Sequence, residues 1–186
     1  MLRTAKDALQ ILRRERVLTL TPAGRPRSLV GEIAGEVRGS WWAHPEGGLI
    51  FAIAGELEDS PEVLAAKLVD GKVSFVHRTL WPQLVRVVLD PGWRREAAAR
   101  LPAPARQLLA AVERAGKLRP QGRAPARREL EKRALVLATQ EHTDSGRHTV
   151  LLRSWEDWPP AALRKEARAL ELDQALGELR SAGLTL

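Results

Sequence analysis

The chain has 186 residues, of which 44% are hydrophobic, and a net charge of +7 at pH 7. It contains no cysteine, which excludes disulfide frameworks, thiolate zinc sites and cysteine nucleophiles. No apolar run approaches the roughly 18 to 20 residues that cross a bilayer, and the N-terminus lacks the apolar core of a signal peptide. We therefore expect a cytoplasmic, globular protein with no membrane partner.

Apolar periodicity in the first third of the chain predicts three helices. They cover residues 5–18, 29–34 and 47–59, with turn-forming segments at 21–27 and 40–45. Ser28 is placed to cap the second helix and Gly35 to end it. The third helix and its flanks contain acidic residues and no lysine or arginine, so we expect phosphates to be repelled from it. Trp41 and Trp42 could form an exposed stacking platform, but adjacent side chains on an extended segment point opposite ways, which favours a core position for at least one.

A β-hairpin is expected after these helices. Asp70-Gly71 separates two apolar runs and predicts a type I′ turn with Val69 opposite Lys72. Continued along the strands, this register pairs Leu68 with Val73, Ala66 with Phe75 and Leu64 with His77. One face of the hairpin is then expected to be core, with Leu64, Ala66, Leu68, Val73 and Phe75. The other face is expected to be solvent-exposed, with Lys67, Lys72 and Ser74. A short helix on Trp81, Leu84, Val85 and Val88 is expected to follow.

Asp90-Pro91-Gly92 interrupts the pattern and predicts a domain boundary. Helices are expected over residues 93–99 and 105–115, followed by an exposed, mobile basic loop over 117–128 and a short helix starting near Arg127. Residues 133–155 predict a second hairpin, in which a three-residue turn places His142 opposite His148. An apolar stripe predicts a final helix over 159–183.

Helices followed by a hairpin thus occur twice, in the order typical of a winged helix. The predicted fold class is α+β, with two tandem winged-helix-like units and a C-terminal helix. The first unit is expected to cover residues 1–90 and the second 91–186.

The net positive charge of the chain comes from one central block. From Arg94 to Arg133 there are twelve basic and four acidic residues, a net +8, whereas the rest of the chain has 18 basic and 19 acidic residues, a net −1. Such asymmetry is typical of a polyanion-binding protein. The alternative is a solvated loop beside ion-paired helices, with Glu113, Glu129 and Glu131 neutralising part of the charge. The candidate nucleic-acid-binding residues are Arg106, Arg114, Lys117, Arg119, Arg123, Arg127, Arg128, Lys132 and Arg133.

Three segments carry a resemblance to known proteins: SWWAHPEGG, KLVDGKVSFVHRTLWPQL and HTDSGRHTVLLRSWEDW. Together they resemble a family of uncharacterised bacterial proteins with winged-helix-like repeats, over most of residues 28–158. The tandem architecture is also similar to the winged-helix units of bacterial alkylpurine DNA glycosylases. The glutamine-containing catalytic motif of those enzymes has no match at residues 139–142, so the resemblance transfers no catalytic residue.

Few residues of the chain are candidates for catalysis or for binding a metal. His142 and His148 could share a metal with Glu141 or Asp144, but a pair of half-exposed strand residues is the commoner arrangement. Ser145 beside these histidines lacks the geometry of a catalytic triad. The chain has neither a GxxxxGK[ST] loop nor a GxGxxG motif after a strand. We interpret His44 as a turn residue and His77 as a core histidine, and we predict no catalytic residue and no cofactor.

The predicted function is therefore non-catalytic binding of nucleic acid, DNA before RNA, through phosphate contacts of the arginine-rich block. One alternative is a regulatory adaptor whose hairpin edges or C-terminal helix bind a protein or a second copy of the chain. A further alternative is a base-processing enzyme similar to a DNA glycosylase, which would require a concave pocket containing a carboxyl or histidine with a shifted pKa.

Overall fold

The computed structural model describes residues 2–120, 122, 124–142 and 148–186, and it leaves undescribed the side chains of residues 140–142, 148 and 149. The chain folds as α+β with two small sheets and divides into two compact units. The first unit comprises Met1–Trp81 and Leu179–Thr185, and the second comprises Pro82–Glu178 with Leu186. These bounds group the C-terminal residues 179–185 with the first unit, whereas the sequence analysis assigned them to the second.

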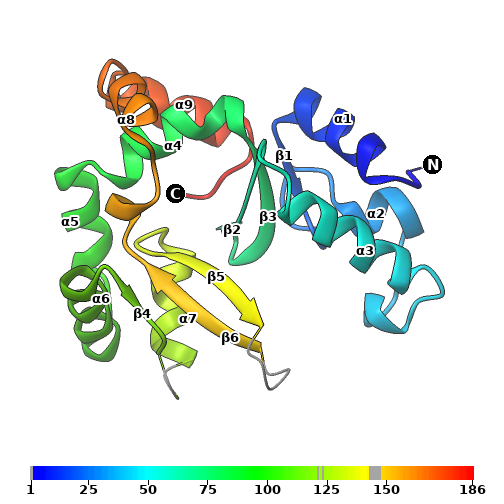
Figure 1. Ribbon diagram of the computed structural model, residues 1–186, viewed down its shortest axis with the longest axis horizontal. Coiled ribbons are helices and arrows are strands. Elements are labelled where there is room, and N and C mark those ends of the chain that lie inside the picture. The colour runs from blue at the N-terminus through cyan, green and yellow to red at the C-terminus, as the bar shows by residue number, and fades with distance from the viewer. Residues whose placement is uncertain (1, 121, 123, 143–147) are drawn as a thin grey trace. The chain divides into compact units, whose positions relative to one another are not determined.

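The first unit contains a three-stranded antiparallel sheet in the order β1-β3-β2. Figure 1 shows α1 and α3 side by side against this sheet. Buried residues of α1, α2 and α3 pack together with Leu18, Val63 and Phe75 of the strands. The elements in chain order are α1 (Ala5–Glu15), β1 (Val17–Thr19), α2 (Leu29–Ala34), the 3₁₀ turn η1 (Trp41–Ala43), α3 (Gly47–Glu58), β2 (Val63–Val69), β3 (Lys72–His77) and the 3₁₀ turn η2 (Arg78–Leu80).

Helix α1 is shorter than predicted. A capping box between Thr4 and Asp7 starts it, and Arg16 ends it in the left-handed conformation with φ 67°. The prediction of helix through residue 18 is wrong, because Val17 and Leu18 pair with Val76 and Phe75 as part of β1. The predicted caps of α2 are confirmed: Ser28 Oγ accepts the backbone N–H of Gly31, and Gly35 ends the helix with φ 70°.

The hairpin turn of the first unit is confirmed, but the register beyond it is wrong. Asp70 and Gly71 have φ 47° and 70°, as a type I′ turn requires, and Val69 pairs with Lys72. The next pairs are Ala66 with Ser74 and Leu64 with Val76, one residue away from the predicted register. A β-bulge at Lys67 and Leu68 produces this shift.

Both faces of β3 are buried over residues 74–77. Ser74, predicted to face water, is 0% exposed, and its hydroxyl donates to the Lys72 carbonyl at 3.0 Å. The C-terminal segment binds at the bulge, because the Thr185 N–H donates to the Leu68 carbonyl and the Asp70 N–H donates to Thr185 Oγ1, both at 2.9 Å. The predicted core face is therefore confirmed at Leu64, Ala66, Leu68 and Phe75, whereas the predicted solvent-exposed face is wrong at Ser74.

The second unit has a three-stranded antiparallel sheet with the equivalent order, β4-β6-β5. Helix α6 contacts α7, β4 and β6 (Figure 1), and its apolar residues form a core with those of α7 and the strands. The remaining elements in chain order are α4 (Trp81–Val88), α5 (Pro91–Ala99), α6 (Ala103–Ala115), β4 (Lys117–Leu118), α7 (Ala124–Lys132), β5 (Leu137–His142), β6 (His148–Arg153), the 3₁₀ turn η3 (Trp155–Asp157), α8 (Ala161–Arg168) and α9 (Leu172–Ser181).

The predicted mobile loop over residues 117–128 is wrong over most of its length. Gly116 ends α6 with φ 70°, and the next two residues form β4, in which Lys117 pairs with Arg153 and Leu118 with Leu152. Helix α7 begins at Ala124 and includes Arg127 and Arg128. A connection over residues 119–123 remains, of which residues 121 and 123 lie outside the described part of the chain.

The predicted C-terminal helix over 159–183 is two helices. Helix α8 ends near Ala169, where the N–H groups of Ala169 and Leu170 bond three residues back. The carbonyl of Leu170 accepts a hydrogen bond from Arg86 Nε at 2.9 Å instead of from a later helical N–H. A side chain from α4 thus helps to end α8. Across the described residues, none of the helices combines the length and apolar composition that a membrane-spanning segment requires.

The two units share a detail that the sequence analysis missed. The carbonyl of Arg16 accepts the His77 N–H at 2.9 Å, and the carbonyl of Gly116 accepts the Ser154 N–H at 2.8 Å. His77 and Ser154 each cap a 3₁₀ turn, and a Trp-Pro pair follows each of them four residues later. The Trp-Pro pairs at 81–82 and 158–159 were the available sequence signal for this internal correspondence.

Candidate nucleic-acid interface

Helix α7 presents two cations on its exposed side. Arg128 and Lys132 lie one helical turn apart, both side chains are exposed, and neither has an ion pair or hydrogen bond with a described residue. Ala126 and Leu130 hold the opposite side of the helix in the core of the second unit. The geometry therefore separates an apolar buried face from a cationic face that is free to meet an anion.

Three candidate residues are engaged within the protein. Arg127 Nε lies 3.5 Å from Glu131 Oε1, and Arg133 Nη2 lies 3.4 Å from Glu129 Oε2. Arg106 donates to the backbone carbonyl of Leu101 while its side chain remains exposed. Part of the predicted neutralisation by Glu129 and Glu131 is thus confirmed, and these arginines have less freedom to contact a ligand.

The other candidates lie at the end of α6 and beyond it. Arg114 and Lys117 are exposed and have no ion pair within the described residues. Arg119 is also exposed and takes part in an interaction within the protein. Arg123 lies outside the described residues. Among the nine candidate residues, the exposed cations without such partners in the described chain are therefore Arg114, Lys117, Arg128 and Lys132.

The corresponding helix of the first unit has the opposite character. Helix α3 precedes the first hairpin as α7 precedes the second, but it contains Glu56 and Glu58 and no lysine or arginine. Its exposed side carries Phe51 and Ala52 beside these carboxylates. The difference in charge means that the two units cannot offer phosphates equivalent surfaces.

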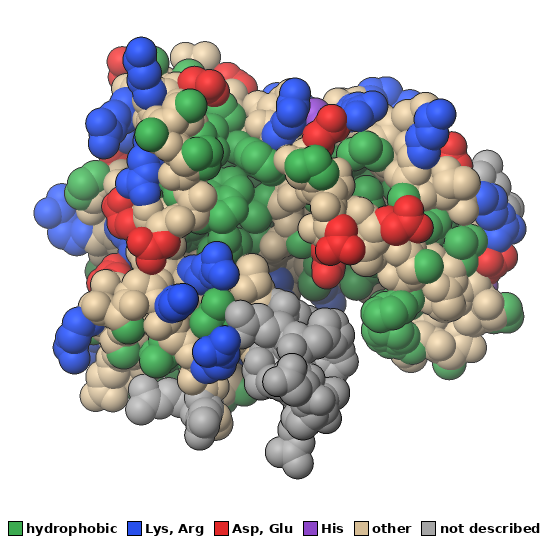
Figure 2. Space-filling model, viewed as in Figure 1, with side chains coloured by type: hydrophobic (Ala, Val, Ile, Leu, Met, Phe, Trp, Pro, Cys, Tyr) green, Lys and Arg blue, Asp and Glu red, His purple; other side chains and the backbone are tan. Residues whose placement is uncertain are grey.

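An aromatic cluster lies on the first unit, and the sequence analysis missed its third member, Phe51. Trp41 and Trp42 lie in η1, where the rings stack with centroids 4.1 Å apart, so the expectation that they point opposite ways is wrong. Phe51 of α3 lies 5.3 Å from Trp42, and these two side chains are 57% and 61% exposed. Figure 2 shows hydrophobic side chains gathered over η1 and the start of α3. We call Trp41, Trp42 and Phe51 the aromatic patch.

Two histidine interpretations are confirmed. His44 Nδ1 accepts the backbone N–H of Glu46 at 3.2 Å, as expected for a turn residue. His77 is 6% exposed, with Nδ1 3.0 Å from Thr79 Oγ1 and Nε2 3.5 Å from the Glu62 carboxylate. Hydrogen bonds from Arg13 lower the pKa of Glu62. His77 is therefore a buried histidine with a partner at Nδ1, whereas its Nε2 lies near the Glu62 carboxylate without a hydrogen bond.

For the candidate metal ligands His142 and His148, only the predicted backbone pairing is confirmed. His142 pairs with His148 across β5 and β6, but their side chains, and residues 143–147 entirely, are outside the described part of the structure. Among the side chains that are described, no group of three or more histidine, aspartate or glutamate residues is placed to hold a metal ion.

Comparison of the chain with protein-family models, with curated proteins and with solved structures gave no match.

Proposed function

We propose that this protein binds nucleic acid, with DNA favoured over RNA, and that the second unit makes the phosphate contacts. The observation that carries the proposal is the pair Arg128 and Lys132 on α7, exposed and without partners among the described residues. Arg114 and Lys117 add two further unpaired cations at the end of α6. Contacts of this kind supply most of the affinity for nucleic acid and little sequence specificity.

The proposal treats each unit as winged-helix-like. Its support is that in each unit a helix and a short strand precede further helical structure and a hairpin, with the short strand paired to the last strand of the hairpin. The helices α2 and α3 stand before the first hairpin, and α7 stands before the second. In helix-turn-helix proteins the second helix enters the major groove. Helix α7 holds this position in the second unit and is cationic, whereas α3 holds it in the first unit and lacks cations. The second unit is therefore the better candidate for docking on DNA.

The test is fluorescence anisotropy with labelled duplex DNA, single-stranded DNA and RNA across a salt series. The wild type is expected to bind duplex DNA with a Kd on the order of 10⁻⁴ to 10⁻⁶ M near physiological salt, and more tightly at low salt. A variant with Arg114, Lys117, Arg128 and Lys132 changed to Gln should lose affinity. The slope of log K against log salt should fall by about one for each cation that contacts a phosphate.

The control variant removes the same charge elsewhere. Lys6, Arg25, Lys165 and Arg180 are exposed cations outside the proposed interface, and their change to Gln should leave most of the affinity. If the wild type binds none of the three nucleic acids at low salt, the proposal is wrong. It is also wrong if both variants lose affinity equally.

A second candidate function, a protein-interaction module, is favoured by the aromatic patch. Exposed Trp and Phe side chains are typical anchors of protein interfaces. Because α3 carries carboxylates and no cations, the expected partner segment is apolar with flanking lysine or arginine. Such a complex should persist at salt concentrations that dissociate a phosphate-dominated one, and Phe51→Glu should abolish it without affecting DNA binding.

A further inference from the structure

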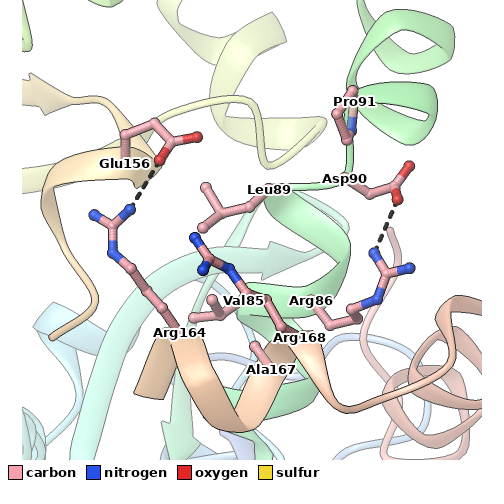
Figure 3. Close-up of a pocket in the computed structure, with 9 residues that line it drawn as sticks. All are labelled: Val85, Arg86, Leu89, Asp90, Pro91, Glu156, Arg164, Ala167 and Arg168. Carbon is pink, nitrogen blue, oxygen red and sulfur yellow. Dashed lines mark hydrogen bonds and ion pairs between the residues drawn. The ribbon is translucent and has the colours of Figure 1, made fainter. Parts of the chain in front are cut away.

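A cavity of about 370 Å³ lies within the second unit, and none of the described candidate nucleic-acid-binding residues lines it. Helices α4 and α8, the start of α5 and the turn η3 surround it (Figure 3). Val85, Leu89, Pro91 and Ala167 form its apolar wall. Its size falls in the lower part of the range of small-molecule sites, roughly 300 to 1,000 Å³.

Two arginines on the cavity wall are held in place by the protein. Arg86 Nη1 bonds the Asp90 carboxylate at 2.8 Å, and its Nε bonds the Leu170 carbonyl at 2.9 Å. Arg164 Nη1 bonds Glu156 at 3.0 Å, and its Nε bonds the Pro159 carbonyl at 3.1 Å. Each carboxylate of the cavity is therefore already matched by one guanidinium.

Arg168 is the third arginine, and it has no equivalent partner. Figure 3 shows its guanidinium directed between Arg164 and Leu89, and within the described chain it forms no ion pair or hydrogen bond. With three arginines and two carboxylates the cavity carries one excess positive charge. A guanidinium presents several N–H donors in one plane and suits the two oxygens of an oxyanion.

We infer that this cavity binds a small organic anion, with its apolar body against Val85 and Leu89 and its oxyanion on Arg168. An apolar wall with a few convergent polar groups is the usual composition of a small-molecule site. Asp90 does not provide the missing counter-charge, because the hydrogen bond from Arg86 lowers its pKa and keeps it ionised in that pair. An incoming anion would therefore meet an unneutralised guanidinium.

The test uses two fluorescent probes with nearly the same apolar body. 8-Anilinonaphthalene-1-sulfonate carries one oxyanion, and N-phenyl-1-naphthylamine is uncharged. The full-length protein is titrated with each. Arg168→Gln should weaken sulfonate binding about ten- to hundredfold, the range expected for loss of a charge-assisted hydrogen bond, and should leave binding of the neutral probe nearly unchanged. Leu89→Gln should weaken the binding of both probes.

Matched variants exclude the rival explanations. Lys165→Gln removes an exposed cation from the same helix outside the cavity and should have no effect. A Trp42→Ala/Phe51→Ala variant removes the aromatic patch, which is the alternative apolar site for the probe, and should retain binding. Competition by hexanoate or by phenyl phosphate then distinguishes a carboxylate ligand from a phosphate ligand.

The inference is overturned if Arg168→Gln binds the sulfonate as the wild type does, if Lys165→Gln loses binding equally, or if removal of the aromatic patch abolishes it. None of these results bears on the nucleic-acid proposal, because the cavity contains none of the residues on which that proposal depends.

Discussion

Arg127 Nε lies 3.5 Å from Glu131 Oε1, one turn further along α7, and the Glu131 side chain is only 3% exposed. Arg128, the next residue, is exposed and has no such partner within the described chain. Two neighbouring arginines of one helix thus have different roles: Arg127 neutralises a nearly buried carboxylate, and Arg128 is available to a ligand.

We predict that Arg127→Gln destabilises the protein and that Arg128→Gln weakens DNA binding. Removal of the Arg127 charge leaves the Glu131 carboxylate with one cation fewer, so the free energy of unfolding should fall by about 1 to 3 kcal/mol. Arg128→Gln should change it by less than about 0.5 kcal/mol and reduce the salt dependence of DNA binding by about one unit of slope. Urea denaturation and anisotropy measure the two effects. Equal effects of the two variants on stability would contradict this division of roles.

The Arg86–Asp90 pair predicts a pH-dependent contribution to stability. Hydrogen bonds from Arg86 and from the Trp93 N–H hold the pKa of Asp90 below its ordinary value of 3.8. The ionised carboxylate therefore stabilises the folded state above that value, and this contribution is lost as the pH falls through the lower folded-state pKa. Asp90→Asn should lower the free energy of unfolding by about 1 kcal/mol at neutral pH.

The pH series supplies the control for this prediction. The difference between wild type and Asp90→Asn should shrink once the pH falls below about 4, since the wild-type carboxylate is then increasingly protonated. Asp90 also caps α5 by accepting the Trp93 N–H at 2.9 Å, so Asp90→Ala should cost about 1 kcal/mol more than Asp90→Asn. A difference that stays constant down to about pH 2 would exclude the ionised pair as its cause.

The burial of the second face of β3 is tested by Ser74→Lys. Ser74 is 0% exposed, so a lysine there must bury its ammonium or disrupt β3, and we expect a loss of more than about 3 kcal/mol or failure to fold. The sequence analysis expected residue 74 on the solvent-exposed face of the strand, where this change would be nearly neutral. Lys72→Ser, two residues earlier and exposed, is the matched control and should cost less than about 0.5 kcal/mol.

Trp155→Phe tests the core of the second unit. The Trp155 ring is fully buried, and its Nε1 donates to the Ala134 carbonyl at 2.7 Å. Phenylalanine leaves that carbonyl without its donor and leaves space unfilled, so the free energy of unfolding should fall by about 1 to 3 kcal/mol. Trp42→Phe, the same change at an exposed position, should fall within about 0.5 kcal/mol of wild type. Thermal or urea denaturation compares the two.

Local sequence signals predicted most of the helices and both hairpins. The cap at Ser28, the end of α2 at Gly35 and the turn at Asp70-Gly71 each depend on one or two neighbouring residues, and all three are confirmed. The pairing of His142 with His148 followed from turn length and is confirmed in the backbone. Strands β1 and β4 were missed because three and two residues are too few to show alternation.

The sequence by itself determined the α+β class, the principal helices, the turn at Asp70-Gly71 and the concentration of positive charge between Arg94 and Arg133, because each arises from residues close together in the chain. Only the tertiary structure decided the hairpin register, where Thr185 bonds Leu68 at the bulge, and the end of α8, where Arg86 bonds Leu170. It also decided which cations are neutralised within the described residues and which remain unpaired. These outcomes depend on side-chain geometry and on partners distant in the chain, and neither is visible in local periodicity or composition.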